Sequence, residues 1–394
     1  MATNSADGDT LKGLKSLVNS TTGLISQLET LLHSIAIHEV HEDPSELIDT
    51  RPSSSLSPSP TSESIDPLSL AHDSATLIKA HTTKLSLLII NEPFTSSAIS
   101  KVLRELVAGP IPALASAVQV CEADKYTFVA RQDLAWRCYR VLKELKGFIE
   151  IIPLDGKVLA NAQKNGTNGD RGSLAATGVV WAACDDVILL KKLGIAGLLI
   201  KKVEEYRDTL KDILEELKEY SEEVDENEDG DDSDADEAEE SGVNGDQMQN
   251  PHISTQQMLD DLMNPRHIPR SDPDKIRERL ESCMKRLRLT TLLYTAIVKR
   301  RLKSVPPLPV TTTQTSVTQR LDEVFPVLKR LPHRFGEVAC AFYELDRDTI
   351  DRTMDSCFFD AFAASEMLMK PWDGQRDEFT EWAEKFQVGI KKPD

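Results

Sequence analysis

Apolar side chains that recur every three or four residues are the feature that most constrains the fold of this 394-residue chain. The clearest series comprises Leu199, Val203, Tyr206, Leu210, Ile213, Leu217 and Tyr220. A second series comprises Ile276, Leu280, Cys283, Leu287, Thr290, Tyr294 and Ile297. Each places its members on one face of an α-helix, in the heptad pattern of helices that pack side by side. No segment shows the period-two alternation of a strand, so the sequence predicts an all-α protein.

Two local features refine this prediction. Separate helices are expected over 173–189 and 191–220, the second with its heptad series packed inside a bundle and not in a free-standing coiled coil. Pro326 and Pro332 are expected to kink or break the helices near the C-terminal end, because proline lacks a backbone N–H and clashes with the preceding turn.

A run of acidic residues divides the helical pattern into two parts. Between Glu222 and Glu240 there are 13 Asp or Glu residues and no Lys or Arg. Because like charges repel along such a run, we expect a disordered acidic linker between two helical bundles. The expected organisation is a disordered tail over 1–9, an N-terminal bundle over 10–221 with a disordered Ser/Pro-rich loop over 43–66, the linker over 222–253, and a C-terminal bundle over 254–394.

Charge and cysteine usage restrict the possible partners and compartment. The net charge is −19, of which 13 units come from the acidic run, so direct binding to nucleic acid is not expected. A basic cluster at Lys285, Arg286, Arg288, Lys299, Arg300, Arg301 and Lys303 is interpreted as the solvated face of an amphipathic helix. Six scattered cysteines, a polar N-terminus and no apolar run near ~20 residues indicate the cytoplasm or the nucleus, with no membrane span.

No residue pattern for catalysis, metal binding or cofactor binding is found. His38 and His41 form H-E-V-H, but a zincin helix needs its histidines four apart with Glu directly after the first. Neither a G-x-S-x-G elbow nor a glycine-rich phosphate loop occurs. We therefore expect a non-enzymatic protein with no cofactor, no metal and no small-molecule substrate, which works by binding other proteins.

The two heptad series supply the candidate partner-binding faces. A partner helix docks through apolar anchors at i, i+3, i+4 and i+7. The candidate residues are Val203, Tyr206, Leu210, Ile213, Leu217, Ile276, Leu280, Leu287 and Tyr294. Candidate phosphorylation sites are Ser57 and Ser59, each followed by proline, and Ser233, which is followed by acidic residues.

The block Val180-Trp181-Ala182-Ala183-Cys184, followed by a Leu-, Lys- and Glu-rich helix and then by the acidic run, carries a family resemblance. It resembles the cyclin-D-binding protein 1-like family, whose vertebrate members are also called Grap2 and cyclin-D interacting protein. The chain departs from the family pattern in its Ser/Pro-rich loop and in a C-terminal amphipathic segment with Trp372, Phe379, Trp382 and Phe386.

The resemblance implies a two-part helical fold, a location in the nucleus and the cytoplasm, and negative regulation of cell-cycle progression and transcription. It also implies D-type cyclins and helix-loop-helix factors as partners. The alternative that the sequence leaves open is a cytoskeletal or adhesion-type bundle like those of vinculin and talin. Long helices with heptads would suit it equally well.

Overall fold

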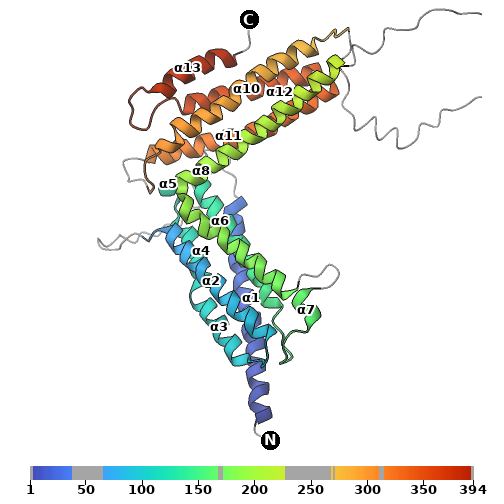
Figure 1. Cartoon of the computed structure of the whole chain (residues 1–394). Helices are drawn as coiled ribbons and strands as arrows, with labels where there is room; N and C mark the ends of the chain where they lie inside the picture. The colour runs from blue at the N-terminus through green and yellow to red at the C-terminus, as the bar shows by residue number, and fades with distance from the viewer. Residues whose placement is uncertain are drawn as a thin grey trace, which may run out of the picture. The chain divides into compact units, whose positions relative to one another are not determined.

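The computed structural model describes residues 3–37, 65–166, 172–226, 268, 271–309 and 315–391. Within these ranges the regular secondary structure consists of helices, and no strand occurs. The prediction of an all-α fold is therefore confirmed (Figure 1). The predicted Ser/Pro-rich loop and most of the acidic linker lie outside the described residues.

The helices follow one another as Figure 1 labels them. The first eight are α1 (Thr3–Ile37), α2 (Pro67–Ile90), α3 (Ser96–Ala108), α4 (Pro110–Val120), α5 (Ala123–Tyr126), α6 (Phe128–Glu150), α7 (Asn161–Asn165) and α8 (Ser173–Glu226). After the acidic run come α10 (Ile276–Arg300), the short 3-10 helix η1 (Leu302–Ser304), α11 (Thr315–Glu344), α12 (Arg347–Met367) and α13 (Glu378–Ile390).

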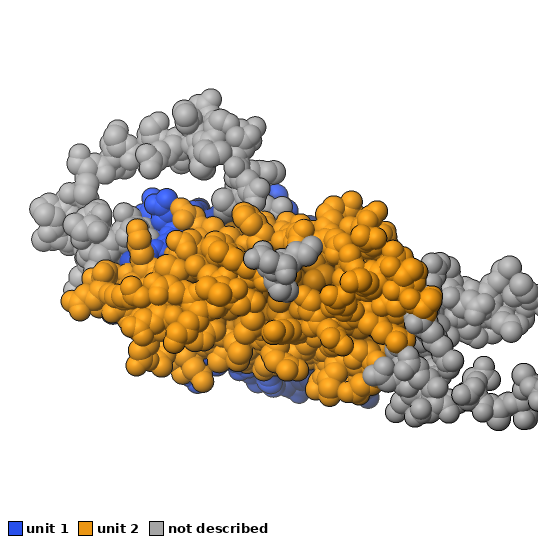
Figure 2. Space-filling view, turned by 90° about the horizontal axis from the view of Figure 1, so that it is seen from above, with its two compact units in different colours: residues 1–199, 306–322 blue, residues 200–305, 323–394 orange. Residues whose placement is uncertain are grey.

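The chain forms two compact units, coloured separately in Figure 2. Unit 1 comprises Met1–Leu199 and Pro306–Asp322, and unit 2 comprises Ile200–Val305 and Glu323–Asp394. This division differs from the boundary expected at the acidic run. The reason is that α8 and α11 are long helices, each of which contributes one part of its length to each unit.

Unit 1 is built on helix pairs whose apolar faces meet. α1 packs along α6, and α2 packs against α3 and α4. Asp66 begins α2 by accepting hydrogen bonds from the backbone N–H groups of Leu68 and Ser69, while Pro67 occupies the first turn, where a missing N–H costs nothing. Thr127 caps α6 in the same way by accepting from the Ala130 N–H.

The first part of α8 packs between α2 and α6. Lys79 of α2 forms an ion pair with Asp185 (2.6 Å), and Thr177 donates a hydrogen bond to the Ser86 hydroxyl (3.0 Å). On the α6 side, Arg140 pairs with Asp186 (2.8 Å). Because residues 79 and 86 of α2 meet residues 185 and 177 of α8 in reversed order, the two helices run antiparallel.

Gly194 interrupts α8. Its backbone lies at φ +65° and ψ 176°, a region that is essentially restricted to glycine. The two helices expected over 173–189 and 191–220 are thus present, but they are joined through this single residue with no intervening loop.

Unit 2 packs the second part of α8 with α10, α11, α12 and α13. Two buried tyrosine hydroxyls donate to main-chain carbonyls of α11, from Tyr294 to Leu328 (2.7 Å) and from Tyr220 to Phe342 (3.4 Å). Pro326 and Pro332 lie inside α11, so the expected breaks do not occur at these prolines. The helix continues past them because its apolar face is buried along its length, at Val324, Phe325, Val327, Leu328, Leu331 and Phe335.

One helix, over Ser173–Glu222, is long and apolar enough to cross a membrane when judged by length and composition alone. We expected none from the sequence. The same test is passed by core helices of soluble proteins. The ion pairs of Asp185 and Asp186 with α2 and α6 are typical of a helix that packs in a bundle.

Replacing Gly194 tests the helix interruption. Gly194→Ala is expected to lower the free energy of unfolding by about 1–3 kcal/mol, because alanine disfavours this backbone conformation although the site has room for its Cβ. Gly178→Ala in the same helix is the matched control. Its Cβ also meets no atom within 4 Å, and alanine at a helical position stabilises by roughly 0.5–1 kcal/mol. Urea unfolding followed by circular dichroism measures both, and equal shifts in the same direction would contradict the assignment.

Candidate protein-binding surface

The candidate residues from the two heptad series lie in unit 2, and most of them are in its core. Eight of the nine candidates are buried, namely Val203, Leu210, Ile213, Leu217, Ile276, Leu280, Leu287 and Tyr294. Tyr206 is half-buried and makes further contacts. These side chains hold the helices of the unit together, so in the folded state they do not offer a face to a partner. Ser57, Ser59, Ser233, His38 and His41 lie outside the described residues.

An exposed apolar surface lies instead on the first part of α8. Leu174 is 49% exposed, Trp181 37% and Leu189 45%, and between them the small residues Gly178 and Ala182 are exposed. These five residues lie within about 100° of arc on the exposed side of α8, and we call them the α8 face. The exposed Asp185, which pairs with Lys79, lies in the same arc. The adjoining helices expose Leu77 and Leu87 on α2 and Trp136 on α6.

The opposite side of the same helical turns is firmly held. Val180, Ala183, Cys184 and Val187 are buried in unit 1. Burial raises the pKa of the Cys184 thiol to about 12, so the sulfur stays protonated at neutral pH and acts as a small apolar group. The first part of α8 thus has apolar residues on two sides. One side is buried in unit 1 and holds the helix in place, and the other side is the α8 face.

Burial raises the pKa of the Asp322 carboxyl to about 6, and this carboxyl accepts a hydrogen bond from the Phe128 backbone N–H (2.8 Å). Within the ranges that the structure describes, no group of three or more His, Cys, Asp or Glu side chains is arranged to hold a metal ion. Burial also raises the pKa of Cys121 and of Cys283 to about 12, which makes both thiols poor nucleophiles.

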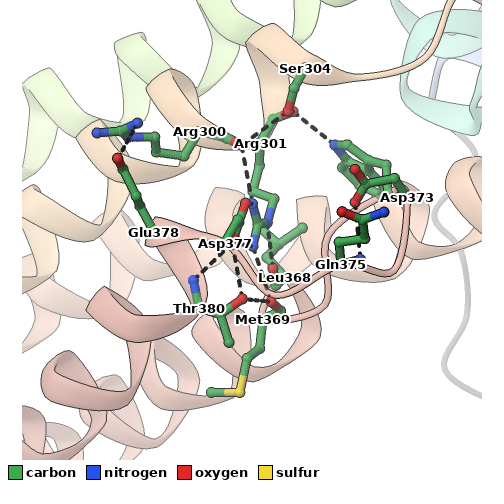
Figure 3. Close-up of polar contacts among 11 residues, drawn as sticks. Arg300, Arg301, Ser304, Leu368, Met369, Asp373, Gln375, Asp377, Glu378 and Thr380 are labelled. Carbon is green, nitrogen blue, oxygen red and sulfur yellow. Dashed lines mark hydrogen bonds and ion pairs between the residues drawn. The ribbon is translucent and has the colours of Figure 1, made fainter.

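The most highly connected polar cluster, around Arg301, is structural. Its guanidinium donates to the carbonyls of Leu368 (2.7 Å) and Met369 (3.0 Å) and pairs with both carboxylate oxygens of Asp377 (2.5 and 3.0 Å), as Figure 3 shows. It also lies 4.2 Å from the centre of the Phe379 ring. Arg301 is only 1% exposed, and its donors are engaged by these acceptors.

This cluster holds the start of α13 against the end of α10. Asp377 caps α13 by accepting from the Thr380 N–H (3.0 Å). The hydrogen bond from Arg301 is the main reason why the pKa of Asp377 is lowered to about 2. At the other end of α13, Arg286 of α10 donates to the Ile390 carbonyl (2.8 Å) and stacks on the Phe358 ring. Two buried arginines, Arg286 of α10 and Arg301 directly after this helix, thus fix both ends of the C-terminal helix.

Fold and surface together define an all-helical protein of two units, with an apolar, solvent-facing helix side on unit 1. Comparisons with known proteins agree with this class and make it specific. Residues 71–223 match the family model described as Grap2 and cyclin-D-interacting, N-terminal. This match supports the resemblance of the chain to the Grap2 and cyclin-D-interacting protein family, and the matched segment contains the whole α8 face. An uncharacterized protein of Schizosaccharomyces pombe is 26% identical over 335 residues, which cover 83% of this chain and 86% of the relative.

The α8 face was not predicted from the sequence, although the sequence contains a signal for it. Between Leu174 and Leu189 apolar residues occur all round the helix, whereas a surface helix of a globular protein usually has one polar side. A helix of that kind must either be buried on all sides or keep an apolar side exposed. Only the structure shows which of the two applies here.

The ion pair between Arg301 and Asp377 predicts a specific dependence of stability on pH. The pKa of Asp377 is lowered from 3.8 to about 2, so the stability that its charge provides is fully present above pH 3.8 and is lost as pH falls toward 2. Asp377→Asn is expected to lower the stability of the chain at pH 6 and to reduce its loss of stability between pH 4 and 2. Denaturant unfolding at several pH values measures both effects.

The control for this experiment is Glu384→Gln, which removes a carboxylate of α13 from an exposed pair with Arg376, a residue just before this helix. Exposed pairs contribute little, so this variant should follow the parent chain at every pH. The role of Asp377 is contradicted if its variant has the same acid sensitivity as the parent.

Proposed function

We propose that this chain is a non-enzymatic regulator that binds a D-type cyclin through the α8 face. The observation that carries the proposal is an exposed row of apolar residues inside the segment that matches the cyclin-D-interacting family. Exposed apolar patches on a folded unit are typical of protein–protein interaction sites.

The geometry of the α8 face suits a helix of the partner. From Leu174 to Leu189 it extends over roughly 22 Å, about four helical turns at 1.5 Å per residue. Gly178 and Ala182 lie in the middle, where small side chains allow a partner backbone to approach closely. Leu174, Trp181 and Leu189 surround them as larger contacts, and tryptophan is among the residues that contribute most to binding energy at interfaces.

The chain would regulate the cell cycle by covering a surface of the cyclin, which requires no catalytic activity. A protein that covers a cyclin surface competes with whatever else binds there, so its effect on cell-cycle progression would be negative. The family resemblance supports this negative effect on cell-cycle progression. It also supports helix-loop-helix factors as further partners and a location in both nucleus and cytoplasm. Phosphorylation at Ser57, Ser59 and Ser233 is part of the same proposal.

A cytoskeletal or adhesion-type scaffold is less well supported. The long helices suit it, but the family match points to a cyclin-interacting protein, and only the helices and heptads favour a vinculin- or talin-like bundle. Co-sedimentation with actin filaments, in parallel with the cyclin-binding assay below, distinguishes the two. Binding to actin without binding to cyclin would favour the scaffold.

Placing a large charge on the α8 face tests the proposed function. Ala182→Arg is expected to weaken binding of a purified D-type cyclin at least tenfold, about 1.4 kcal/mol, because the arginine would have to be buried under the partner. The side chain should not disturb the helix, since residue 182 is exposed and Asp186 lies four residues further on. Calorimetric titration measures the affinity, and circular dichroism verifies the fold.

The matched control is Asn19→Arg, which adds the same charge at an exposed position of α1, outside the α8 face. It should bind cyclin as the parent chain does. If Ala182→Arg and Asn19→Arg both bind with the parent affinity, the α8 face is not the cyclin-binding surface. If the parent chain shows no affinity for any D-type cyclin, the proposed partner is wrong.

A further inference from the structure

The solvent-facing side of α10 carries a row of cations. They are Lys285, Arg288 and Lys299, followed by Lys303 in η1, and the apolar Leu292 lies among them. All are exposed, and Leu292 is 49% exposed in the middle of the row. With 3.6 residues per turn, positions 285, 288, 292 and 299 fall within about 60° of arc. We call these residues the basic face of α10.

The cations of this face have no partner among the described residues. No hydrogen bond or ion pair joins the side chains of Lys285, Arg288, Lys299 or Lys303 to any part of the chain that the structure describes. Their basic neighbours differ in this respect. Arg300 pairs with Glu378 (2.5 Å), and the buried Arg286 and Arg301 hold α13.

The segment that contains the acidic run is attached to unit 2 at both ends, to α8 and to α10. The run begins at Glu222, in the last turns of α8, and the chain continues in unit 2 to α10. Between Glu222 and Glu240 it carries 13 carboxylates with no Lys or Arg. About 50 residues separate the end of α8 from the start of α10, and their extended length of roughly 160 Å far exceeds the ~37 Å of α10 itself.

We propose that residues 225–240 of the acidic run dock on the basic face of α10 within the same chain. The carboxylates are complementary in charge to a face that the folded unit leaves unpaired. Tethering at both ends raises the effective concentration of the run to about the millimolar range, so weak individual contacts suffice. Docking covers the cations until a more acidic partner displaces the run. Phosphate on Ser233 would add about 1.5–2 negative charges and strengthen it.

A nucleic acid is the less suitable occupant of this face. Duplex binding gains its affinity from several phosphate contacts distributed over a surface, and here the cations form a single line on one helix. The net charge of −19 repels any polyanion that arrives from solution. This repulsion does not oppose docking of the acidic run in the same way, because the run is already part of the chain.

Zero-length carbodiimide cross-linking of the full chain, followed by mass spectrometry, tests the proposal. This reagent joins a carboxylate to a lysine amine only when the two are in contact. Cross-links within one chain are expected between residues 225–240 and Lys285, Lys299 and Lys303. Their yield should fall about fivefold or more when the ionic strength rises from about 0.05 M to about 0.5 M, because salt screens exposed charges.

Charge removal on the face supplies the second measurement. In Lys285→Gln/Lys299→Gln the yield at the remaining reporter, Lys303, should fall severalfold, since two of the attracting charges are lost. The control Lys201→Gln/Lys211→Gln removes two exposed cations from α8 in the same unit and should leave the yield at Lys303 unchanged.

Three outcomes would overturn the proposal. One is a cross-link pattern spread evenly over all exposed lysines of the chain. Another is an unchanged yield at Lys303 in the Lys285→Gln/Lys299→Gln variant. The third is a set of cross-links found only in covalent dimers, which would assign the basic face to the acidic run of a second copy.

Discussion

The structure depends on how α8 distributes its apolar side chains on the two sides of Gly194. Before this residue the helix is apolar nearly all round, and its buried side is held between α2 and α6. After it, the apolar residues are confined to one side, with Lys and Glu on the others. The first part therefore contributes both to a core and to an apolar surface, while the second contributes to a core and to a charged surface. The same helix thus exposes an apolar surface in unit 1 and a charged surface in unit 2.

Buried arginines play the corresponding role in unit 2. Placing a guanidinium in the interior is costly unless its hydrogen bonds are satisfied. Arg301 meets this condition with two carbonyls and a carboxylate, and Arg286 with a carbonyl and an aromatic ring. Since all of these acceptors lie on α12, α13 or the loop between them, the arginines order the C-terminal helix as well as their own surroundings. The aromatic segment that departs from the family pattern is thereby part of the unit 2 core.

Helix identity was readable from the sequence, whereas the roles of individual helix faces were not. The heptad series predicted the buried residues of unit 2 because apolar spacing reports which side of a helix is buried. It does not report whether that side meets another helix of the same chain or a partner, so Val203 and Leu280 were assigned to a partner and belong to the core. The prolines of α11 show the same limit, since local helix-breaking preference is outweighed by the burial of Phe325 and Phe335 on either side. The unit boundary was missed because a long helix can serve two cores with no break in sequence pattern where it changes from one to the other.

The two proposed surfaces work by different physics, which makes them separable by experiment. Contact through the α8 face would depend on removing apolar area from water, and added salt weakens that contribution little. Contact through the basic face of α10 would depend on exposed charges, and its strength would fall steeply with ionic strength. The α8 face lies in unit 1 and the basic face in unit 2. A change of ionic strength therefore acts on one surface and leaves the other nearly unaffected, so cyclin binding that weakens sharply with salt would point away from α8 and toward the cations of α10.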